Sequence, residues 1–182
     1  MATHAPIEVS DIFGNLDPAD EGETWYVIHV KPKREKKLAE YSIRNEINYY
    51  LPLVESIRTY KYRKIKFTKP LFASYIFVKC NLEQKRTLII SGHIVQFLKV
   101  PSEKMFLDQL RSIKFGYDRG AEYSDAKYLK DGIRVEIISG PFKGLTGVVK
   151  NQNDVSEVIL QVNMLRQAVS VKVTPAQIKI IR

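Results

Sequence analysis

Two groups of basic residues offer the chemistry that phosphate binding needs. The first surrounds the end of an expected strand and the start of an expected helix, where backbone amides add positive potential. It consists of Lys31, Lys33, Arg34, Lys36 and Lys37. The second alternates with aromatic rings, a pattern typical of surfaces on which bases stack. It consists of Arg58, Lys61, Arg63, Lys64, Lys66 and Lys69, with Tyr60, Tyr62 and Phe67.

For the second group, the alternative is a solvated hairpin whose rings pack on a sheet. The candidate nucleic-acid contacts from the two groups are Lys31, Lys33, Arg34, Lys37, Arg63, Lys64 and Lys66.

Catalytic and metal-binding chemistry is not indicated. A nucleophilic triad needs three positioned groups, but His4, His29 and His93 fall in a tail, a strand and a turn. The single cysteine, Cys80, cannot form an internal disulfide or a zinc site of standard spacing with these histidines. Acidic residues outside the N-terminus are isolated, which argues against a paired-carboxylate hydrolase. We therefore expect no enzymatic activity, no metal and no cofactor.

The segment 140–147, Gly-Pro-Phe-Lys-Gly-Leu-Thr-Gly, is rich in glycine without being a phosphate loop. It lacks the Gly-Lys-Ser/Thr end of such a loop, and no helix is expected after it. We expect Gly140, Gly144 and Gly147 to provide positive φ angles and close backbone approach in a tight connection between two strands.

Charge is distributed unevenly over the 182 residues, which carry a formal net charge of +9. Residues 1–23 contain six acidic residues and no Lys or Arg, so the positive excess belongs to the rest of the chain, mainly residues 24–122. A field of that sign favours nucleic acid as the partner, with an anionic membrane as the weaker alternative. Solvated lysines without a partner are the third interpretation.

Composition and segment lengths exclude several protein classes. A hydrophobic content of 45% excludes disorder throughout. No secretory signal and no run of eighteen apolar residues is present, so we expect a cytoplasmic protein without a membrane partner.

The N-terminal half has the pattern of an α+β domain. Residues 1–23 are expected to be a flexible acidic leader. Strands are expected at 25–30, 51–57, 71–78 and 93–100, and helices at 84–91 and from Ser102 to Gly116. A further helix after Pro32 is expected to bury the stripe Ala39, Ile43, Ile47 and Tyr50. This order predicts a split βαβ antiparallel sheet with helices on one face, over residues 24–116.

The C-terminal part has the pattern of a small β-barrel. Residues 117–127 read as a linker. Five short strands follow within 128–182, at 133–139, 145–150, 158–163, 168–173 and 178–181, with no helical period between them.

Three motifs in this order resemble the NusG family of transcription elongation factors over residues 24–182. They are Trp25-Tyr-Val, the segment Pro-Leu-Phe-Ala-Ser-Tyr-Ile-Phe-Val at 70–78, and the KOW-like segment from Gly132 to Val149. The resemblance implies an N-terminal (NGN) domain and a five-stranded KOW barrel. It also implies a monomer that binds the clamp helices of bacterial RNA polymerase and favours processive elongation without catalysis.

The resemblance also implies contact residues. The polymerase-binding residues would be Phe72, Tyr75, Phe77, Leu107, Leu110, Arg86 and Thr87. On an ideal strand, Phe72 would face away from Tyr75 and Phe77, and the alternative for all three is a place in the core. Lys31, Lys33, Arg34 and Lys37 would lie near upstream DNA and the non-template strand. Met164 and Leu165 would lie near the barrel loop that recruits the termination factor Rho or a small-subunit ribosomal protein.

One departure from the family pattern concerns the subtype. Housekeeping members usually have Phe-Pro-Gly-Tyr where this chain has Phe-Ala-Ser-Tyr at 72–75, so the chain is more similar to operon-specific RfaH-like and UpxY-like antiterminators. Some relatives refold the barrel into a helical hairpin, but the β-branched residues of 158–173 favour a stable barrel here. The alternative function is a stand-alone KOW-type RNA-binding or ribosome-associated protein.

Overall fold

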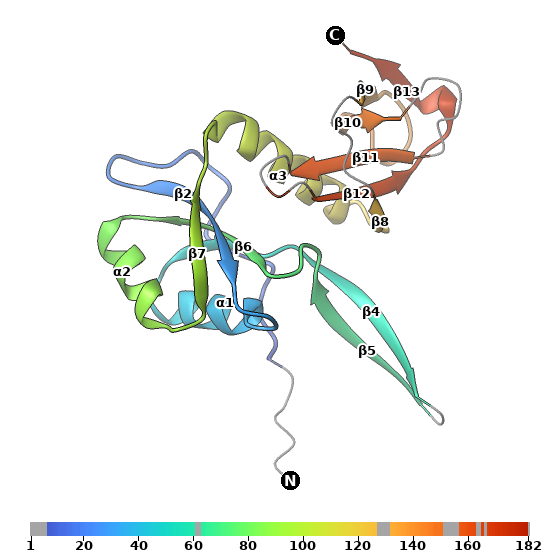
Figure 1. Cartoon of the computed structure of the whole chain (residues 1–182). Helices are drawn as coiled ribbons and strands as arrows, with labels where there is room; N and C mark the ends of the chain where they lie inside the picture. Colours follow the sequence, from blue (N-terminus) through green and yellow to red (C-terminus); the bar gives the residue numbers. More distant parts are fainter. Residues whose placement is uncertain are drawn as a thin grey trace. The chain divides into compact units, whose positions relative to one another are not determined.

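The computed structural model describes residues 7–60, 63–126, 132–150, 157–162, 165 and 167–181. The chain forms two compact units that divide between Glu103 and Lys104. The predicted α+β class is confirmed, since an antiparallel sheet with helices is followed along the chain by a second antiparallel sheet (Figure 1). The sequence division placed the helix that begins at residue 103 in the first domain, whereas nearly all of it falls in the second unit.

The first unit is built on a five-stranded antiparallel sheet in the order β1-β3-β6-β2-β7. Its strands are β1 (Ile12–Phe13), β2 (Thr24–Val30), β3 (Asn48–Tyr50), β6 (Tyr75–Cys80) and β7 (Ile94–Lys99). Helix α1 (Glu35–Arg44) connects β2 to β3, and α2 (Leu82–Ile90) connects β6 to β7. This is the split βαβ arrangement expected from the sequence.

The core of the first unit lies between the two helices and one face of the sheet. Ile28 and Val78 point into it from neighbouring strands, with Leu38 from α1 and Leu88 from α2, and none of the four has exposed surface. Each such side chain stabilises the fold by about 1.5–3 kcal/mol relative to exposure. This core fixes the sheet on which the candidate surfaces are built.

Helix α1 is shorter than predicted, and the expected helical stripe is wrong for Ile43, while Ala39, Ile47 and Tyr50 are buried, the last two outside the helix. The helix ends at Arg44, and Glu46 has a positive φ of 54° before β3 begins. Ile43 is 36% exposed. The buried face consists of Glu35, Leu38, Ala39 and Ser42, at helical spacing. Because two residues of that face, Glu35 and Ser42, are polar, the spacing of apolar residues alone does not show the helical period.

The strand expected at 71–78 begins only at Tyr75, because a turn precedes it. Ser74 has a positive φ of 66°, and the Tyr75 N–H donates to the Phe72 carbonyl across 3.2 Å. Phe72 is therefore outside the strand alternation. Its ring packs edge to face against Phe77, with the ring centroids 5.9 Å apart. The expectation that Phe72 and Phe77 face opposite ways is wrong for this reason.

A two-stranded hairpin, β4 (Leu53–Tyr60) and β5 (Arg63–Pro70), projects from the first unit (Figure 1). Its strands pair with each other through eight residues and form a sheet of their own. At its root, Leu53 is buried in the core, and the Lys36 ammonium donates to the Thr68 hydroxyl across 2.6 Å. Beyond the root, most of the described side chains are exposed.

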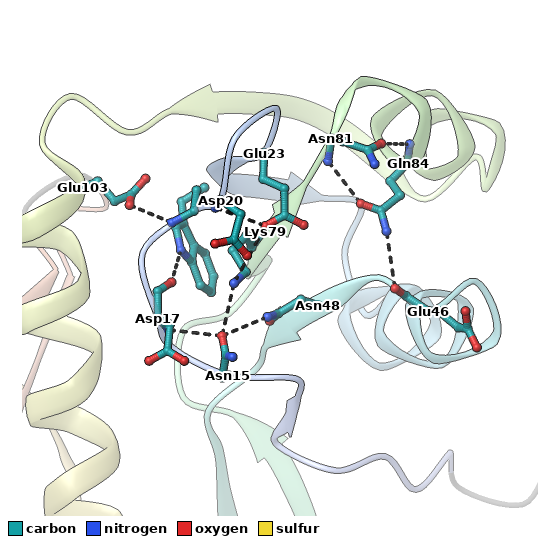
Figure 2. A network of polar contacts seen from close by, with 12 residues as sticks. Asn15, Asp17, Asp20, Glu23, Glu46, Asn48, Lys79, Asn81, Gln84 and Glu103 are labelled. Carbon is teal, nitrogen blue, oxygen red and sulfur yellow. Dashed lines mark hydrogen bonds and ion pairs between the residues drawn. The ribbon is translucent and has the colours of Figure 1, made fainter.

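The acidic leader is not the flexible tail that the sequence predicted, as far as residues 7–23 are concerned. Its strand β1 adds to the edge of the sheet by pairing with β3. Leu16 is buried, and the Trp25 indole N–H donates to the Asp17 carbonyl across 3.0 Å. The Asn15 side-chain oxygen accepts from the buried Lys79 ammonium across 3.1 Å (Figure 2). These contacts join the leader to distant segments of the chain, so its local composition could not predict them.

The second unit contains helix α3 (Glu103–Asp118) and a six-stranded antiparallel sheet in the order β13-β9-β10-β11-β12-β8. The strands are β8 (Ser124–Ala126), β9 (Ile133–Ile137), β10 (Thr146–Val149), β11 (Glu157–Val162), β12 (Gln167–Lys172) and β13 (Ile178–Ile180), with the short helix η2 (Pro175–Gln177) before β13. The five expected strands are present. The sixth, β8, lies in the segment that was interpreted as a linker.

Candidate functional site

The face of the sheet opposite the two helices carries an aromatic cluster. Phe77 and Tyr50, from neighbouring strands, have ring centroids 6.2 Å apart, and Phe72 closes on Phe77 from the preceding turn. The exposed fractions of Phe72 and Phe77 are 2% and 0%. These two members of the expected polymerase-binding set are therefore brought together, but as buried side chains.

Leu107 and Leu110 lie on the buried face of α3, together with Phe106 and Ile113. Their exposed fractions are 1% and 0%. They belong to the second unit, whereas Phe72, Tyr75 and Phe77 belong to the first. The expected set thus divides between the two units.

Tyr75 is the member of the aromatic set with exposed surface. It lies at the start of β6, is half-buried, and stacks on His29 of β2 with the ring centroids 5.1 Å apart. The two residues are cross-strand partners, so the backbone ladder fixes their pairing. An aromatic pair at the edge of a buried cluster is the arrangement typical of interface anchors.

A buried carboxylate holds the turn that precedes Tyr75. Glu35, in the first turn of α1, has 7% exposed surface, and its Oε1 accepts from the Ser74 N–H across 2.7 Å. The Ser74 carbonyl in turn accepts from the Val30 N–H across 2.9 Å. Glu35 was not among the predicted site residues. Its place within the period of the buried face of α1 was the signal that could have found it.

Helix α2 presents an apolar strip next to the predicted contact Arg86. Leu82, Ile89 and Ile90 are 65%, 56% and 79% exposed and share the outward side of the helix with Arg86 at spacings of three and four. Arg86 itself is exposed, whereas the Thr87 hydroxyl donates to the Glu83 carbonyl within the helix. Of the two predicted residues, Arg86 is the one with its functional group directed outward.

The first basic group is assembled at the junction of β2 and α1. Lys31, Lys33 and Lys37 are exposed, and the Lys31 ammonium donates to the Gly92 carbonyl across 2.7 Å. The neighbouring residue His93, which was not among the predicted site residues, also lies at this cluster: its carbonyl accepts from the Lys31 N–H across 2.9 Å. No local pattern signals His93, because it reaches the cluster only through the folding of the sheet.

Burial and three neighbouring cations, Arg34, Lys37 and Lys31, lower the pKa of His93 below its ordinary value of 6.5. The imidazole is therefore neutral at pH 7 and becomes a further cation of the cluster in acid. With a lowered pKa, His93 binds a proton less readily in the folded state than in the unfolded state. Protonation as the pH falls through and below 6.5 therefore lowers the stability of the fold.

Affinity for a phosphate-rich ligand at this cluster is expected to rise several-fold between pH 7.5 and 5.5. Protonation of His93 adds a charge that a bound phosphate stabilises. Fluorescence anisotropy with a labelled oligonucleotide, at constant ionic strength, measures the effect. In His93→Gln the rise should shrink, and an unchanged pH profile in that variant would exclude His93 as its source.

The basic residues of the hairpin that the structure describes are all exposed, but they do not share one surface. Lys61 and Tyr62 of the predicted group lie outside the described residues. Arg63 and Lys64 are neighbours on β5 and point to opposite faces of the ribbon, and Lys66 points with Lys64. The second predicted group is thus separated into two sets.

The glycine-rich segment forms the connection between β9 and β10. Gly140 and Gly144 have φ angles of 83° and 92°, and the Gly144 N–H donates to the Ile137 carbonyl across 2.7 Å. Gly147 is needed for space instead: a Cβ there would lie 2.7 Å from the Ile159 carbonyl oxygen of the neighbouring strand. The glycines act on the backbone and present no phosphate-binding side chain.

The predicted partner loop of the second unit is only partly described. Leu165 is 9% exposed and so packs inward, and Met164 lies outside the described residues.

The lone cysteine is inert in the fold. Cys80 is buried in the core of the first unit, and burial raises the pKa of its thiol to about 12 despite the nearby charge of Lys85. Within the described ranges, no three His, Cys, Asp or Glu side chains are grouped so that they could hold a metal ion. In the same ranges, every helix is too short or too polar to span a bilayer.

Comparison with known proteins agrees with this architecture. The family model described as "Transcription termination factor nusG" matches residues 23–109, and the model of the KOW motif matches residues 134–172. The two models together span more than two thirds of the chain. An antiparallel domain of this kind followed by a KOW segment defines a class of transcription factor. The chain belongs to the NusG family, as a transcription termination/antitermination factor.

Individual relatives are distant in sequence. The chain is 22% identical over 185 residues to the transcription termination/antitermination protein NusG of Rickettsia bellii, covering 94% of this chain and 96% of the relative. It is 24% identical over 182 residues to the protein of the same name from Rickettsia felis, covering 90% and 92%. A chain of the crystal structure of the MjSpt4:Spt5 complex is 17% identical, with a TM-score of 0.28 over 87% of this chain and 97% of that chain.

Proposed function

We propose that this protein binds bacterial RNA polymerase through the sheet face around Tyr75 and keeps the enzyme in processive elongation. The observation that carries the proposal is the half-buried Tyr75–His29 pair at the edge of the buried aromatic cluster. Clamp helices are the expected partner of this face. The exposed strip of α2 next to Arg86 is a second contact surface on the same unit.

Nucleic acid is the second proposed partner. The cluster at the β2–α1 junction, with Lys31, Arg34, Lys37 and His93, and the exposed basic hairpin both belong to the first unit. A factor that carries polymerase and phosphate contacts on one unit would bind an elongation complex more tightly than polymerase alone, because each contact raises the effective concentration at the other.

Operon-specific antitermination is the form of the function that we propose, as in RfaH-like paralogues. Its support is Ser74, which adopts a positive φ of 66° at a place where housekeeping members have glycine. Recruitment of Rho or a ribosomal protein by the second unit stays a prediction.

The proposal is tested by binding to purified polymerase core. Tyr75→Ala is expected to weaken binding at least tenfold, since aromatic anchors contribute of order 1–4 kcal/mol. Tyr26→Ala is the matched control, because Tyr26 is also half-buried on β2, also pairs with an aromatic ring (Phe97, centroids 5.5 Å apart), and lies on the helix-covered face. Its binding should be unchanged.

Equal effects of the two substitutions would overturn the assignment of this face. If the unaltered chain ignores polymerase but binds RNA with a steep salt dependence, the protein is an RNA-binding KOW protein instead.

A further inference from the structure

The register of the hairpin sorts its charges into two unlike faces. Residues that pair directly across an antiparallel ladder point to the same side, and neighbours along a strand point to opposite sides. Arg58 pairs with Ile65, and Ser56 pairs with Phe67, so Arg58 and Phe67 share a face. The Arg58 guanidinium carbon lies 5.7 Å from the centroid of the Phe67 ring, as this sorting requires.

The first face, which we term the Arg face, contains three cations around an aromatic ring. Arg58, Arg63, Phe67 and Lys69 point to this side together with Val54, Ser56 and Ile65. The three cations and Phe67 are exposed, and Phe67 retains 36% of its surface. No acidic side chain of the described hairpin residues points to this side.

The second face, which we term the Lys face, is weaker in charge and has no ring. It carries Lys64 and Lys66, whose positive charges are opposed by Glu55 on the same side. Ile57, directly across from Lys66, is 57% exposed. The two faces therefore carry formal charges of +3 and +1 on one scaffold.

The scaffold holds these side chains in a fixed row. On β5, Arg63, Phe67 and Lys69 point to the same side, with Ile65 between Arg63 and Phe67. Successive side chains on one side of a strand are about 6.6 Å apart. The root is fixed by buried Leu53, by the hydrogen bond between Lys36 and Thr68, and by the Leu71 N–H, which donates to the Pro52 carbonyl across 2.7 Å. Because the backbone of the hairpin is already ordered, binding of a ligand to this row costs the protein little conformational entropy.

We propose that the Arg face of the hairpin is a binding surface for single-stranded nucleic acid. Arg58, Arg63 and Lys69 contact phosphates spread along one strand, and a base stacks on Phe67. Cations that flank an exposed ring on one side are the combination that binds single strands, since a duplex hides the faces of its bases. The inference rests on the proposed function in taking nucleic acid as the ligand, and it is independent of the polymerase contact.

The test compares two double variants of the full chain that remove the same charge from opposite faces. Arg58→Gln with Lys69→Gln alters the Arg face, and Lys64→Gln with Lys66→Gln alters the Lys face. Binding of a fluorescein-labelled oligothymidine is followed by anisotropy over a salt series. The Arg-face variant should bind at least tenfold more weakly, with the slope of log K against log salt reduced by about 1.4, or about 0.7 for each phosphate lost. The Lys-face variant should lose less than about threefold, through the long-range field alone.

A third variant separates stacking from charge. Phe67→Leu should weaken oligothymidine binding about fivefold or more and leave the salt slope unchanged, because a base loses its ring and no phosphate loses its cation. Far-UV circular dichroism of all variants confirms that the hairpin mutations leave the fold intact.

Three results would overturn the proposal: equal losses in the two double variants, an unlabelled duplex that competes better than a single strand, or no measurable binding by the unaltered chain at low salt. Polymerase binding of the same variants is measured in parallel. Intact polymerase binding with a failed oligonucleotide test rejects this inference alone, whereas lost polymerase binding in Tyr75→Ala and Tyr26→Ala alike rejects the assigned polymerase face alone.

Discussion

Deletion of residues 1–20 is expected to lower the free energy of unfolding of the first unit by about 3 kcal/mol. The deletion removes β1 from the sheet edge and exposes the surface under Leu16, whose burial alone contributes about 1.5–3 kcal/mol. It also takes the acceptor from the Trp25 indole N–H and the Asn15 oxygen from the Lys79 ammonium (Figure 2). Glu23, whose carboxylate lies 3.9 Å from the Lys79 ammonium, remains in the truncated chain.

Urea unfolding followed by tryptophan emission measures this loss, because Trp25 is the only tryptophan of the chain and lies in the first unit. Asp17→Asn with Asp20→Asn is the control. It removes two leader charges but leaves the Asp17 carbonyl in place, and both side chains are exposed. If this control destabilises the unit as much as the deletion does, charge rather than packing explains the role of the leader.

Gly147→Ala is expected to destabilise the second unit by about 3 kcal/mol, at the upper end of the cost of overpacking. An added Cβ would lie 2.4 Å from a methyl carbon of Val158 and 2.7 Å from the Ile159 carbonyl oxygen. The second of these atoms is backbone, so β10 and β11 must separate to admit the methyl group. Amide hydrogen exchange should show the loss in the second unit and leave the first unit protected.

Gly144→Ala is the matched control for this effect. Its Cβ would meet nothing nearer than a Phe115 ring atom at 3.9 Å, but its φ of 92° is unfavourable for alanine. The expected cost is about 1–2 kcal/mol, from backbone conformation alone. A smaller loss in Gly147→Ala than in Gly144→Ala would contradict the steric explanation.

The sequence predicted the elements whose signals are local. β2, α2, β7 and five of the six strands of the second unit appear close to where β-branched runs, helical patterns or turn residues indicated them, whereas β8 lies in the segment interpreted as a linker. The start of α2 also has a local signal that the predicted range 84–91 did not use: Asn81 and Gln84 bond reciprocally to each other's backbone in a capping box of four consecutive residues (Figure 2).

Features that depend on contacts between distant segments were not predictable in this way. The leader is ordered because Asn15 and Asp17 meet side chains from β6 and β2, and its acidic composition indicated the opposite. Glu35 was missed because a carboxylate on a buried helix face is rare unless it has a partner, and that partner is the backbone of Ser74. The two faces of the hairpin required the pairing register, which a basic stretch alone does not give.

The burial of Cys80 makes the native chain suited to site-directed labelling. Its thiol has 1% exposed surface and a pKa raised to about 12, so maleimides, which react with the thiolate, should leave the folded protein unmodified. A cysteine introduced at Thr59, an exposed hairpin position, would then be the single reactive thiol. A dye or crosslinker attached there would follow the hairpin within an assembled elongation complex without prior removal of any natural cysteine.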